Sequence, residues 1–206
     1  MLYDLDGTLA NSVDLIVTSY NHAFATVLGR QVPRERVLGW IGRSLPEVFR
    51  EVDPEHAAEL ERYYMEYNLT HLDTITGYPG IPEVIDDLAG AGLRQAVVTS
   101  KRRSVAEQTL MFAGIPDAAQ LVVALEDSER HKPDPEPLLV ALDRVDARPQ
   151  EAVYVGDAVT DLLAAQAARL AGIGVTWGAG LASELQAAPH EGLAQDAAAL
   201  RNLLLG

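Results

Sequence analysis

The chain contains no cysteine, so disulfide bonds and thiolate metal sites are excluded. Positive charge is also scarce, because 16 lysines and arginines stand against 30 aspartates and glutamates, a formal net charge of −14. A surface that acidic repels phosphate backbones, so we expect no nucleic-acid partner. An anionic ligand would need a local pocket built from a cation, lysine, arginine and backbone N–H groups.

Long apolar runs are missing as well, and no basic segment followed by an apolar run marks a signal peptide. We therefore expect a cytoplasmic protein without a membrane partner. Apolar residues make up 48% of the 206 residues, which is ordinary for a globular protein and argues against disorder. The length suits one large domain, or one domain with a small insertion.

The first third of the chain has helical spacing of its apolar residues. We predict helices over 12–28, 37–52 and 56–72, with Ser12 as a possible N-cap of the first helix and Gly29 as its stop. No convincing strand is predicted between residues 12 and 76. This part of the sequence predicts a small helical unit over 12–77, inserted into a core formed by 1–11 and 78–206.

From Gly80 onward, predicted helices and strands alternate. The strands are expected at 95–100, 121–124, 152–155 and 173–176. The helices are expected at 81–91, 104–114, 136–145, 161–171 and 194–205, and a capping box from Ser104 to Glu107 opens the second of them. Alternation of this kind favours an α/β fold with a doubly wound, mostly parallel sheet covered on both faces.

Ligands bind such sheets outside the carboxyl ends of the strands. Asp4 and Asp6 follow the first predicted strand, where side chains two apart point to one face. Thr99 and Ser100 end the second strand, and Asp157 follows the strand at 152–155. We expect these groups to converge at one edge of the sheet, together with Lys132 from the loop at 131–135.

Several carboxylates in one pocket call for a hard cation with oxygen ligands, most plausibly Mg²⁺. Lys132, Thr99 and turn amides could hold the oxygens of a phosphate. A carboxylate close to phosphorus is a competent nucleophile. A second carboxylate two residues on could protonate the leaving oxygen and later take a proton from water. The residues therefore indicate phosphoryl chemistry on a small phosphorylated metabolite.

Four motifs, in this order, resemble those of the haloacid dehalogenase superfamily. They are the run DLDGTL at 4–9, the run VVTS at 97–100, Lys132 before Pro133, and the run GDAVTD at 156–161. The helical stretch between the first two resembles the family's cap, and the rest resembles its Rossmann-like core. Ile41-Gly42-Arg43, His131-Lys132-Pro133 and the run GVTWG at 174–178 are similar to the phosphoglycolate phosphatase and pyrophosphatase-like subgroup.

The resemblance implies roles for the two acidic residues of the first motif and for the fourth motif. Asp4 would be the nucleophile and a metal ligand. Asp6 would be the general acid/base, with its backbone carbonyl on the metal. Asp157 would be the third protein ligand of Mg²⁺, and Asp161 would act from behind it, orienting a water on the metal or Lys132.

The resemblance also implies roles in substrate binding. Thr99 and Lys132 would bind the phosphoryl group, with Ser100 beside them in the substrate site. Arg43 either reads the far end of the substrate from the cap or is an ordinary surface arginine after a glycine turn. Only three residues precede Asp4, so the first strand is expected to be short.

The function implied is a Mg²⁺-dependent phosphatase acting on a small phosphomonoester, such as phosphoglycolate, through an aspartyl-phosphate. A pyrophosphatase, a nucleotide phosphatase and a phosphomutase of the β-phosphoglucomutase kind stay open on the same core. A receiver-type signalling domain is disfavoured, because it has no use for the helical insert or for an acid/base at Asp6. A catalytically silent binding protein ranks low, because no group needed for turnover is missing. We expect a monomer or a homodimer.

Overall fold

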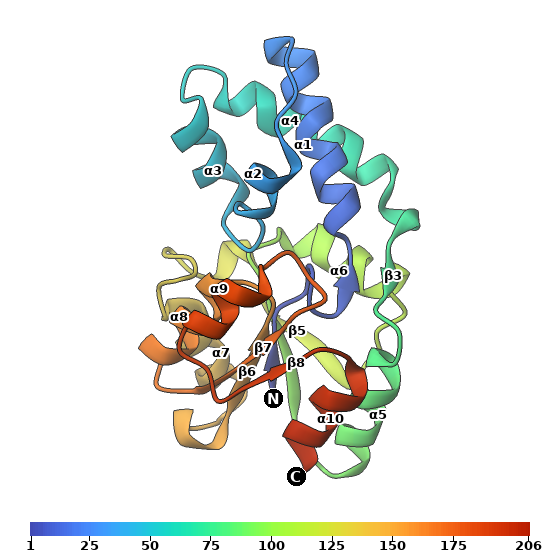
Figure 1. The fold of residues 1–206 in the computed structure, drawn as a ribbon, viewed down its shortest axis with the longest axis vertical. Helices are drawn as coiled ribbons and strands as arrows, with labels where there is room; N and C mark the ends of the chain where they lie inside the picture. The colour runs from blue at the N-terminus through green and yellow to red at the C-terminus, as the bar shows by residue number, and fades with distance from the viewer.

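Six parallel strands form the centre of the computed structural model, which describes residues 1–206 (Figure 1). Their order across the sheet is β5-β4-β1-β6-β7-β8. The two-residue strand β1 lies between β4 and β6, and Tyr3 is in register with Val97 and Val155. The strands are β1 (Leu2–Tyr3), β4 (Gln95–Val98), β5 (Ala119–Val123), β6 (Val153–Gly156), β7 (Ala171–Val175) and β8 (Gly192–Ala194).

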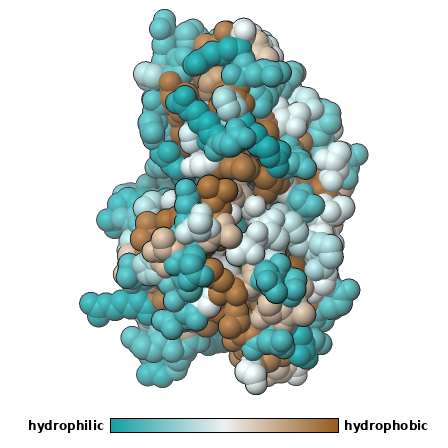
Figure 2. Space-filling view, in the orientation of Figure 1, coloured by the Kyte–Doolittle hydropathy of each residue, from teal (hydrophilic) through white to brown (hydrophobic).

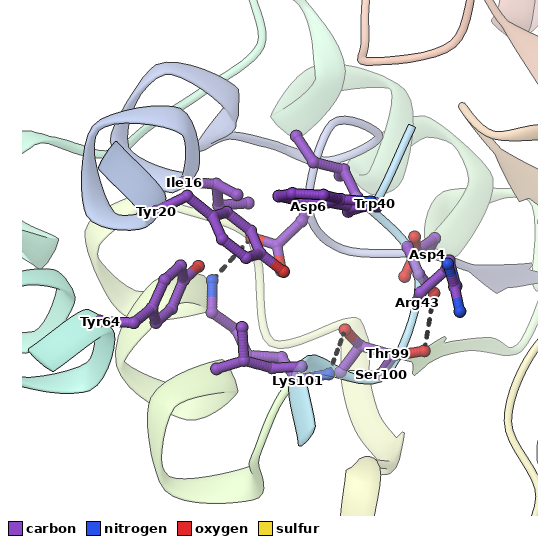
Figure 3. A pocket seen from close by; sticks show the side chains of 13 residues that line it. Asp4, Asp6, Ile16, Tyr20, Trp40, Arg43, Tyr64, Thr99, Ser100 and Lys101 are labelled. Atoms are coloured by element: carbon purple, nitrogen blue, oxygen red, sulfur yellow. Dashed lines mark hydrogen bonds and ion pairs between the residues drawn. The ribbon is translucent and has the colours of Figure 1, made fainter. Parts of the chain in front are cut away.

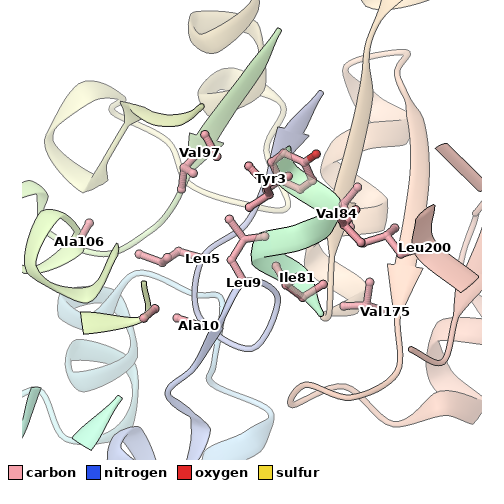
Figure 4. Packing of buried hydrophobic residues seen from close by; sticks show 14 of the residues in the cluster. Tyr3, Leu5, Leu9, Ala10, Ile81, Val84, Val97, Ala106, Val175 and Leu200 are labelled. Carbon is pink, nitrogen blue, oxygen red and sulfur yellow. The ribbon is translucent and has the colours of Figure 1, made fainter. Parts of the chain in front are cut away.

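Alternate residues of the central strands face two separate hydrophobic cores, as a period of two requires. Tyr3, Val97 and Val155 lie in the first core, which also contains apolar side chains of α5 (Ile81–Gly90), α6 (Arg103–Phe112) and α10 (Ala197–Leu205) (Figure 4). The neighbouring residues of these strands lie in the second core, against α7 (Glu136–Arg144) and α8 (Val159–Ala167). Helices therefore cover both faces, which confirms the predicted α/β fold.

A helical unit stands above the carboxyl edge of the sheet (Figure 1). It consists of α1 (Val13–Leu28), α2 (Arg34–Leu38), α3 (Leu45–Val52) and α4 (Ala57–Thr70). Its own hydrophobic core is rich in aromatic side chains, and the Tyr20 ring lies 5.2 Å from that of Trp40 and 4.9 Å from that of Tyr64. A short antiparallel ribbon of β2 (Ala10–Asn11) and β3 (Thr76–Gly77) joins the unit to the rest of the chain.

The structure corrects the predicted helix over 37–52. The chain breaks there into α2 and α3, because the turn between them includes Gly42 in the left-handed region at φ 87°. The ribbon of β2 and β3, the helix α9 (Ala182–Ala187) and the strand β8 were not predicted. These elements are two to six residues long. Two or three residues are too few for a hydrophobic period to be recognised, and α9 buries only Leu185.

Helix starts also differ from the expectations. The capping box at Ser104 is wrong: α6 begins at Arg103 and has no side-chain cap. Ser12 does precede α1, but its hydroxyl donates to the Asp6 carboxylate instead of capping the helix. The last helix begins at Ala197, and not at residue 194, because Asp196 caps it by accepting a hydrogen bond from the Ala199 N–H at 2.8 Å.

Hydrophilic residues cover most of the margin of the face drawn in Figure 2, and hydrophobic residues form narrow strips towards its middle. None of the helices combines the length and the apolar character that crossing a membrane requires. The polar margin agrees with the excess of 30 acidic over 16 basic residues.

Candidate active site

The ends of three neighbouring strands bring the predicted groups together. Asp4 directly follows β1, and its N–H donates to the carbonyl of Val155 at 2.9 Å, which extends the ladder to β6. Thr99 directly follows β4, and Asp157 directly follows β6. Leu5 is fully buried in the first core, while Asp4 and Asp6 on either side of it line one cavity. The expectation that these two carboxylates share a face is confirmed.

A buried cluster of charged side chains lies beneath this edge. Carboxylate oxygens of Asp4, Asp157 and Asp161 lie within 4.8 Å of one another, and all three residues are at most 1% exposed. The Lys132 ammonium lies 3.0 Å from Asp4 Oδ2 and 2.7 Å from Asp161 Oδ1, and it donates to the Tyr154 hydroxyl at 3.0 Å. One ammonium would not neutralise three ionised carboxylates, so full ionisation would leave the cluster with excess negative charge.

Burial and the neighbouring carboxylates shift the pKa values of the groups in this cluster. Burial raises the pKa of Asp4 well above its usual range, and the neighbouring Asp161 and Asp157 raise it further although Lys132 opposes them. Burial, aided by Asp161, raises the pKa of Asp157 to about 7. Burial alone would lower the pKa of Lys132, but Asp161 and Asp4 outweigh it and raise that pKa well above its usual value. The two carboxylates therefore favour the charged form of Lys132 despite its burial.

Two loops hold the Asp157 carboxylate in place. The Thr8 hydroxyl donates to its Oδ1 at 2.9 Å, and the Ala179 N–H donates to its Oδ2 at 2.7 Å. Gly7 and Gly178 pack against it so closely that a Cβ atom at either glycine would lie 2.2 or 2.3 Å from Asp157 Oδ2. The first motif and the loop after β7 thus fix one carboxylate between them.

The three carboxylates fit a divalent cation. Asp4 Oδ1 is buried and has no hydrogen-bond partner, which is costly for a polar atom unless something else satisfies it. An oxygen-only set of this kind suits a hard cation such as Mg²⁺. Asp161 is held from behind, because its Oδ2 accepts a hydrogen bond from the Ala158 N–H at 3.0 Å where α8 begins.

A small cavity of about 60 Å³ lies between the sheet edge and the helical unit (Figure 3). The Asp6 carboxylate points into it, and its Oδ1 accepts hydrogen bonds from Ser12 Oγ at 2.6 Å and from Lys101 Nζ at 2.7 Å. Aromatic side chains of the helical unit cover the cavity. The lining residues are Asp4, Asp6, Ile16, Tyr20, Trp40, Ile41, Gly42, Arg43, Leu45, Tyr64, Thr99, Ser100 and Lys101.

Three further predicted residues, Thr99, Ser100 and Arg43, line this cavity and have different interaction partners. Thr99 is 4% exposed, and its Oγ1 accepts from the Lys101 N–H at 3.2 Å. The Ser100 hydroxyl donates to the Gly42 carbonyl at 2.9 Å, so it joins the core to the helical unit. The Arg43 side chain lines the cavity and forms an ion pair with Glu51 of α3.

Sequence reasoning missed three residues of the site. Lys101 directly follows Thr99 and Ser100, but a lysine in a loop gives no distinguishing signal. Thr8 belongs to the first motif, although nothing in its neighbours shows that it would reach Asp157. Tyr154 gave the clearest signal, because a tyrosine between two valines of a buried strand needs a partner for its hydroxyl. It donates to the Val98 carbonyl at 3.1 Å and accepts from Lys132.

Known proteins resemble this chain in sequence and in structure. The sequence model of the haloacid dehalogenase-like hydrolase family matches residues 1–175. The pyrophosphatase PpaX of Bacillus cereus is 37% identical over 178 residues, which are 86% of this chain and 82% of that protein.

Solved structures of hydrolases and phosphatases also resemble this chain in fold. A hydrolase from Pseudomonas syringae superposes with a TM-score of 0.88 at 27% identity, over 98% of this chain and 96% of that one. A predicted phosphoglycolate phosphatase from Haemophilus somnus has a TM-score of 0.88 at 25% identity, over the same shares. With its ordered motifs and its buried acidic cluster, this chain belongs to the haloacid dehalogenase-like hydrolases and is an enzyme of that family.

Proposed function

We propose that this enzyme hydrolyses a small phosphomonoester of the phosphoglycolate kind, with Mg²⁺, through an aspartyl-phosphate at Asp4. The observation that carries the proposal is the position of the Asp4 carboxylate. It belongs to the buried cluster with Lys132 and Asp157, and it also lines the cavity that contains Asp6. Its unpartnered Oδ1 marks the atom that has no structural task.

The phosphoryl group would bind in the cavity beside Asp4 and Thr99, and Lys132, which pairs with Asp4 from outside the cavity, would exchange that contact for one to a phosphoryl oxygen. Asp4 and Asp157 would hold the Mg²⁺ together with the Asp6 carbonyl, and Asp161 would orient this set. When bound, the ion would supply positive charge next to the phosphoryl oxygens. Lys132 adds a fixed positive charge beside Asp4 in a site with little water, where such charge stabilises a transferring phosphoryl group most.

The reaction runs in two steps. The Asp4 carboxylate attacks phosphorus, the bond from phosphorus to the ester oxygen breaks, and the leaving oxygen takes a proton from Asp6. Water then attacks the aspartyl-phosphate at phosphorus and gives its proton to Asp6, which releases inorganic phosphate and restores the Asp4 carboxylate. Ser12 and Lys101 both hold Asp6 Oδ1, which leaves Oδ2 available for the proton.

The cavity favours small substrates. Its volume of about 60 Å³ is far below the roughly 300 Å³ or more of sites for drug-sized ligands. Tyr20, Trp40 and Tyr64 cover it from the helical unit and limit the size of the leaving group. This size is our reason for ranking a nucleotide below a small phosphate ester.

Inorganic pyrophosphate is the second candidate substrate. It is about as small as phosphoglycolate, and the sequence relative at 37% identity is called a pyrophosphatase. The residues that would act on it are the same, because a phosphate in place of an alcohol becomes the leaving group.

The test is phosphate release by the purified protein from phosphoglycolate, pyrophosphate and p-nitrophenyl phosphate, each with MgCl₂ or with EDTA. We expect turnover that depends on Mg²⁺ and is lost in the Asp4→Asn variant, which keeps the shape of the side chain. Release that survives in EDTA, or in Asp4→Asn, would refute the proposed mechanism. With a sugar phosphate such as glucose 1-phosphate, whose other hydroxyls can accept the phosphoryl group, formation of an isomeric phosphate ester without free phosphate would indicate a mutase instead.

A further inference from the structure

Lys101 is a partly buried cation whose only task in the proposed reaction is to hold Asp6. Its side chain is 11% exposed, and its ammonium lies 2.7 Å from Asp6 Oδ1 in the small cavity. Both backbone groups of Lys101 are hydrogen-bonded. Its N–H donates to Thr99 Oγ1 at 3.2 Å, and its carbonyl accepts from the Leu125 N–H at 3.0 Å. The turn that supplies the Thr99 hydroxyl therefore also places this ammonium.

Lys101 and Lys132 differ in how many of their ammonium N–H donors already bind a protein acceptor. An ammonium has three donors. Lys132 directs its donors to Asp161, Tyr154 and Asp4, and it does not line the cavity. Lys101 makes one side-chain hydrogen bond, to Asp6. The cavity thus contains an ammonium with two unused donors.

The surroundings of Lys101 make these donors effective. Tyr20, Tyr64 and Ile16 line the same cavity and leave little water to screen the charge (Figure 3). Lys101 points toward Asp6, the residue assigned to the leaving oxygen. A group bound near this ammonium would therefore belong to the leaving part of the substrate, and the chemistry that an ammonium with free donors recognises is an anion.

We propose that Lys101 selects substrates whose leaving group carries its own negative charge, such as a carboxylate or a second phosphate. This inference rests on the proposed function and deepens it. Both candidate substrates satisfy it, because the leaving group of phosphoglycolate is glycolate, which carries a carboxylate, and the leaving group of pyrophosphate is phosphate. The net charge of −14 repels such a dianion or trianion at long range, so the attraction has to come from cations inside the cavity.

The test compares two substrates that differ in charge and little in size: 2-phosphoglycolate and 2-hydroxyethyl phosphate. We expect the wild-type enzyme to favour 2-phosphoglycolate in kcat/KM. Lys101→Met should reduce that preference at least tenfold, because a hydrogen bond to a charged group is worth about 1.5–3 kcal/mol. Any effect through Asp6 acts on both substrates and cancels in the ratio. Lys101→Gln repeats the test if the methionine variant does not fold.

Two controls separate Lys101 from the other positive charges. Arg102 is the adjacent cation, pairs with Glu61 of α4 and does not line the cavity, so Arg102→Met should leave the ratio unchanged. Arg43 does line the cavity, so Arg43→Met is measured as well. Lys101→Arg keeps the charge and should keep the preference.

The outcomes are distinct. If the wild type releases phosphate without preferring the charged substrate, or if Lys101→Met slows both substrates equally, the inference is wrong while the proposed function stands. If Arg43→Met alone abolishes the preference, Arg43 and not Lys101 recognises the negative charge of the leaving group, and the inference is wrong. If the wild type releases no phosphate from any ester or from pyrophosphate with MgCl₂, the proposed function fails and the inference fails with it.

Discussion

Asp4 connects the two parts of the site. Its Oδ2 pairs with Lys132 in the buried cluster, and its unpartnered Oδ1 belongs to a residue that also lines the cavity. Asp6, two residues on, has a different environment, since it accepts hydrogen bonds from Ser12 and Lys101. The two carboxylates therefore lie in different environments, and the proposed reaction gives them different tasks, a nucleophile and a proton carrier.

The role of Asp6 predicts how its loss depends on the leaving group. Asp6→Asn should lower kcat on an alkyl phosphate by about 10²- to 10⁴-fold, because an alkoxide needs a proton to leave. The loss in the first step should be smaller for p-nitrophenyl phosphate, whose phenolate leaves without one. The burst phase of p-nitrophenol release measures this step alone. An equal loss for both substrates in this step would argue against proton donation by Asp6.

The raised pKa of Asp157 predicts how stability depends on pH. Its pKa is about 7 in the folded chain, against about 3.9 for an unfolded aspartate. The folded state therefore binds more protons between these values, and the stabilisation is complete below about pH 4 and lost as pH rises through about 7. In EDTA, the free energy of unfolding of the wild type should fall relative to Asp157→Asn over this range.

Urea unfolding of both proteins between pH 5 and 8 measures this difference, and MgCl₂ is the control. Added Mg²⁺ should restore wild-type stability most at the highest pH, because the ion binds the ionised carboxylates. A difference between the two proteins that stays constant with pH would contradict the burial of a titrating Asp157.

Single residues could be assigned from the sequence where a motif surrounds them. Asp4, Asp157 and Lys132 were recognised because their neighbours and their order along the chain restrict the alternatives. Lys101 and Tyr154 could not be assigned, because their contacts join segments 95 and 22 residues apart. The hydroxyl of Ser100 shows the same limit, since its partner is the Gly42 carbonyl, 58 residues away in the helical unit.

In the loop after β7, the close packing of Gly178 against Asp157 predicts that one added methyl group will disturb the site. A Cβ at Gly178 would lie 2.3 Å from Asp157 Oδ2 and 2.4 Å from the Gly7 carbonyl oxygen. Gly178→Ala should therefore displace the Asp157 carboxylate and lower Mg²⁺ affinity or kcat by about 10- to 100-fold, the usual effect of disturbing the support of a metal ligand. Calorimetric titration with MgCl₂ and steady-state kinetics measure it.

Gly90 provides the matched control, because it is exposed at the end of α5 and a Cβ there meets nothing within 4 Å. Gly90→Ala should leave activity unchanged and stabilise the protein by up to about 1 kcal/mol, since alanine is the better helix former. Equal activity of both variants would show that the loop after β7 does not position Asp157.

The core elements with an apolar run or a helical period were predictable, and the elements without such a pattern were not. The apolar runs at β4 and β6 and the periodic helices α5 and α7 give clear patterns. The two-residue strands β2 and β3 exist only because they pair with each other across 65 to 67 positions of sequence. The break between α2 and α3 depends on the turn at Gly42, whose carbonyl contacts the core at Ser100. Tertiary contacts of this kind leave no local signature.

The whole molecule combines a sheet that gathers charged groups with a helical unit that covers them. Residues from Asp4 to Asp161 reach one site because the central strands are parallel and β1, β4 and β6 are neighbours. The helical unit contributes the aromatic cover and, through Arg102 and Glu61, an ion pair to the loop that holds Lys101. In the proposed function the core supplies the reacting groups and Lys101, and the helical unit limits the size of the substrate.

The most direct test of the account is to identify the residue that receives the phosphoryl group. Borohydride reduces an aspartyl-phosphate to homoserine, so the enzyme is mixed with substrate and MgCl₂, quenched with borohydride and analysed by peptide mass spectrometry. The account predicts homoserine at position 4, only when both substrate and MgCl₂ are present. Reduction at another carboxylate, or none at position 4 during rapid turnover, would contradict it.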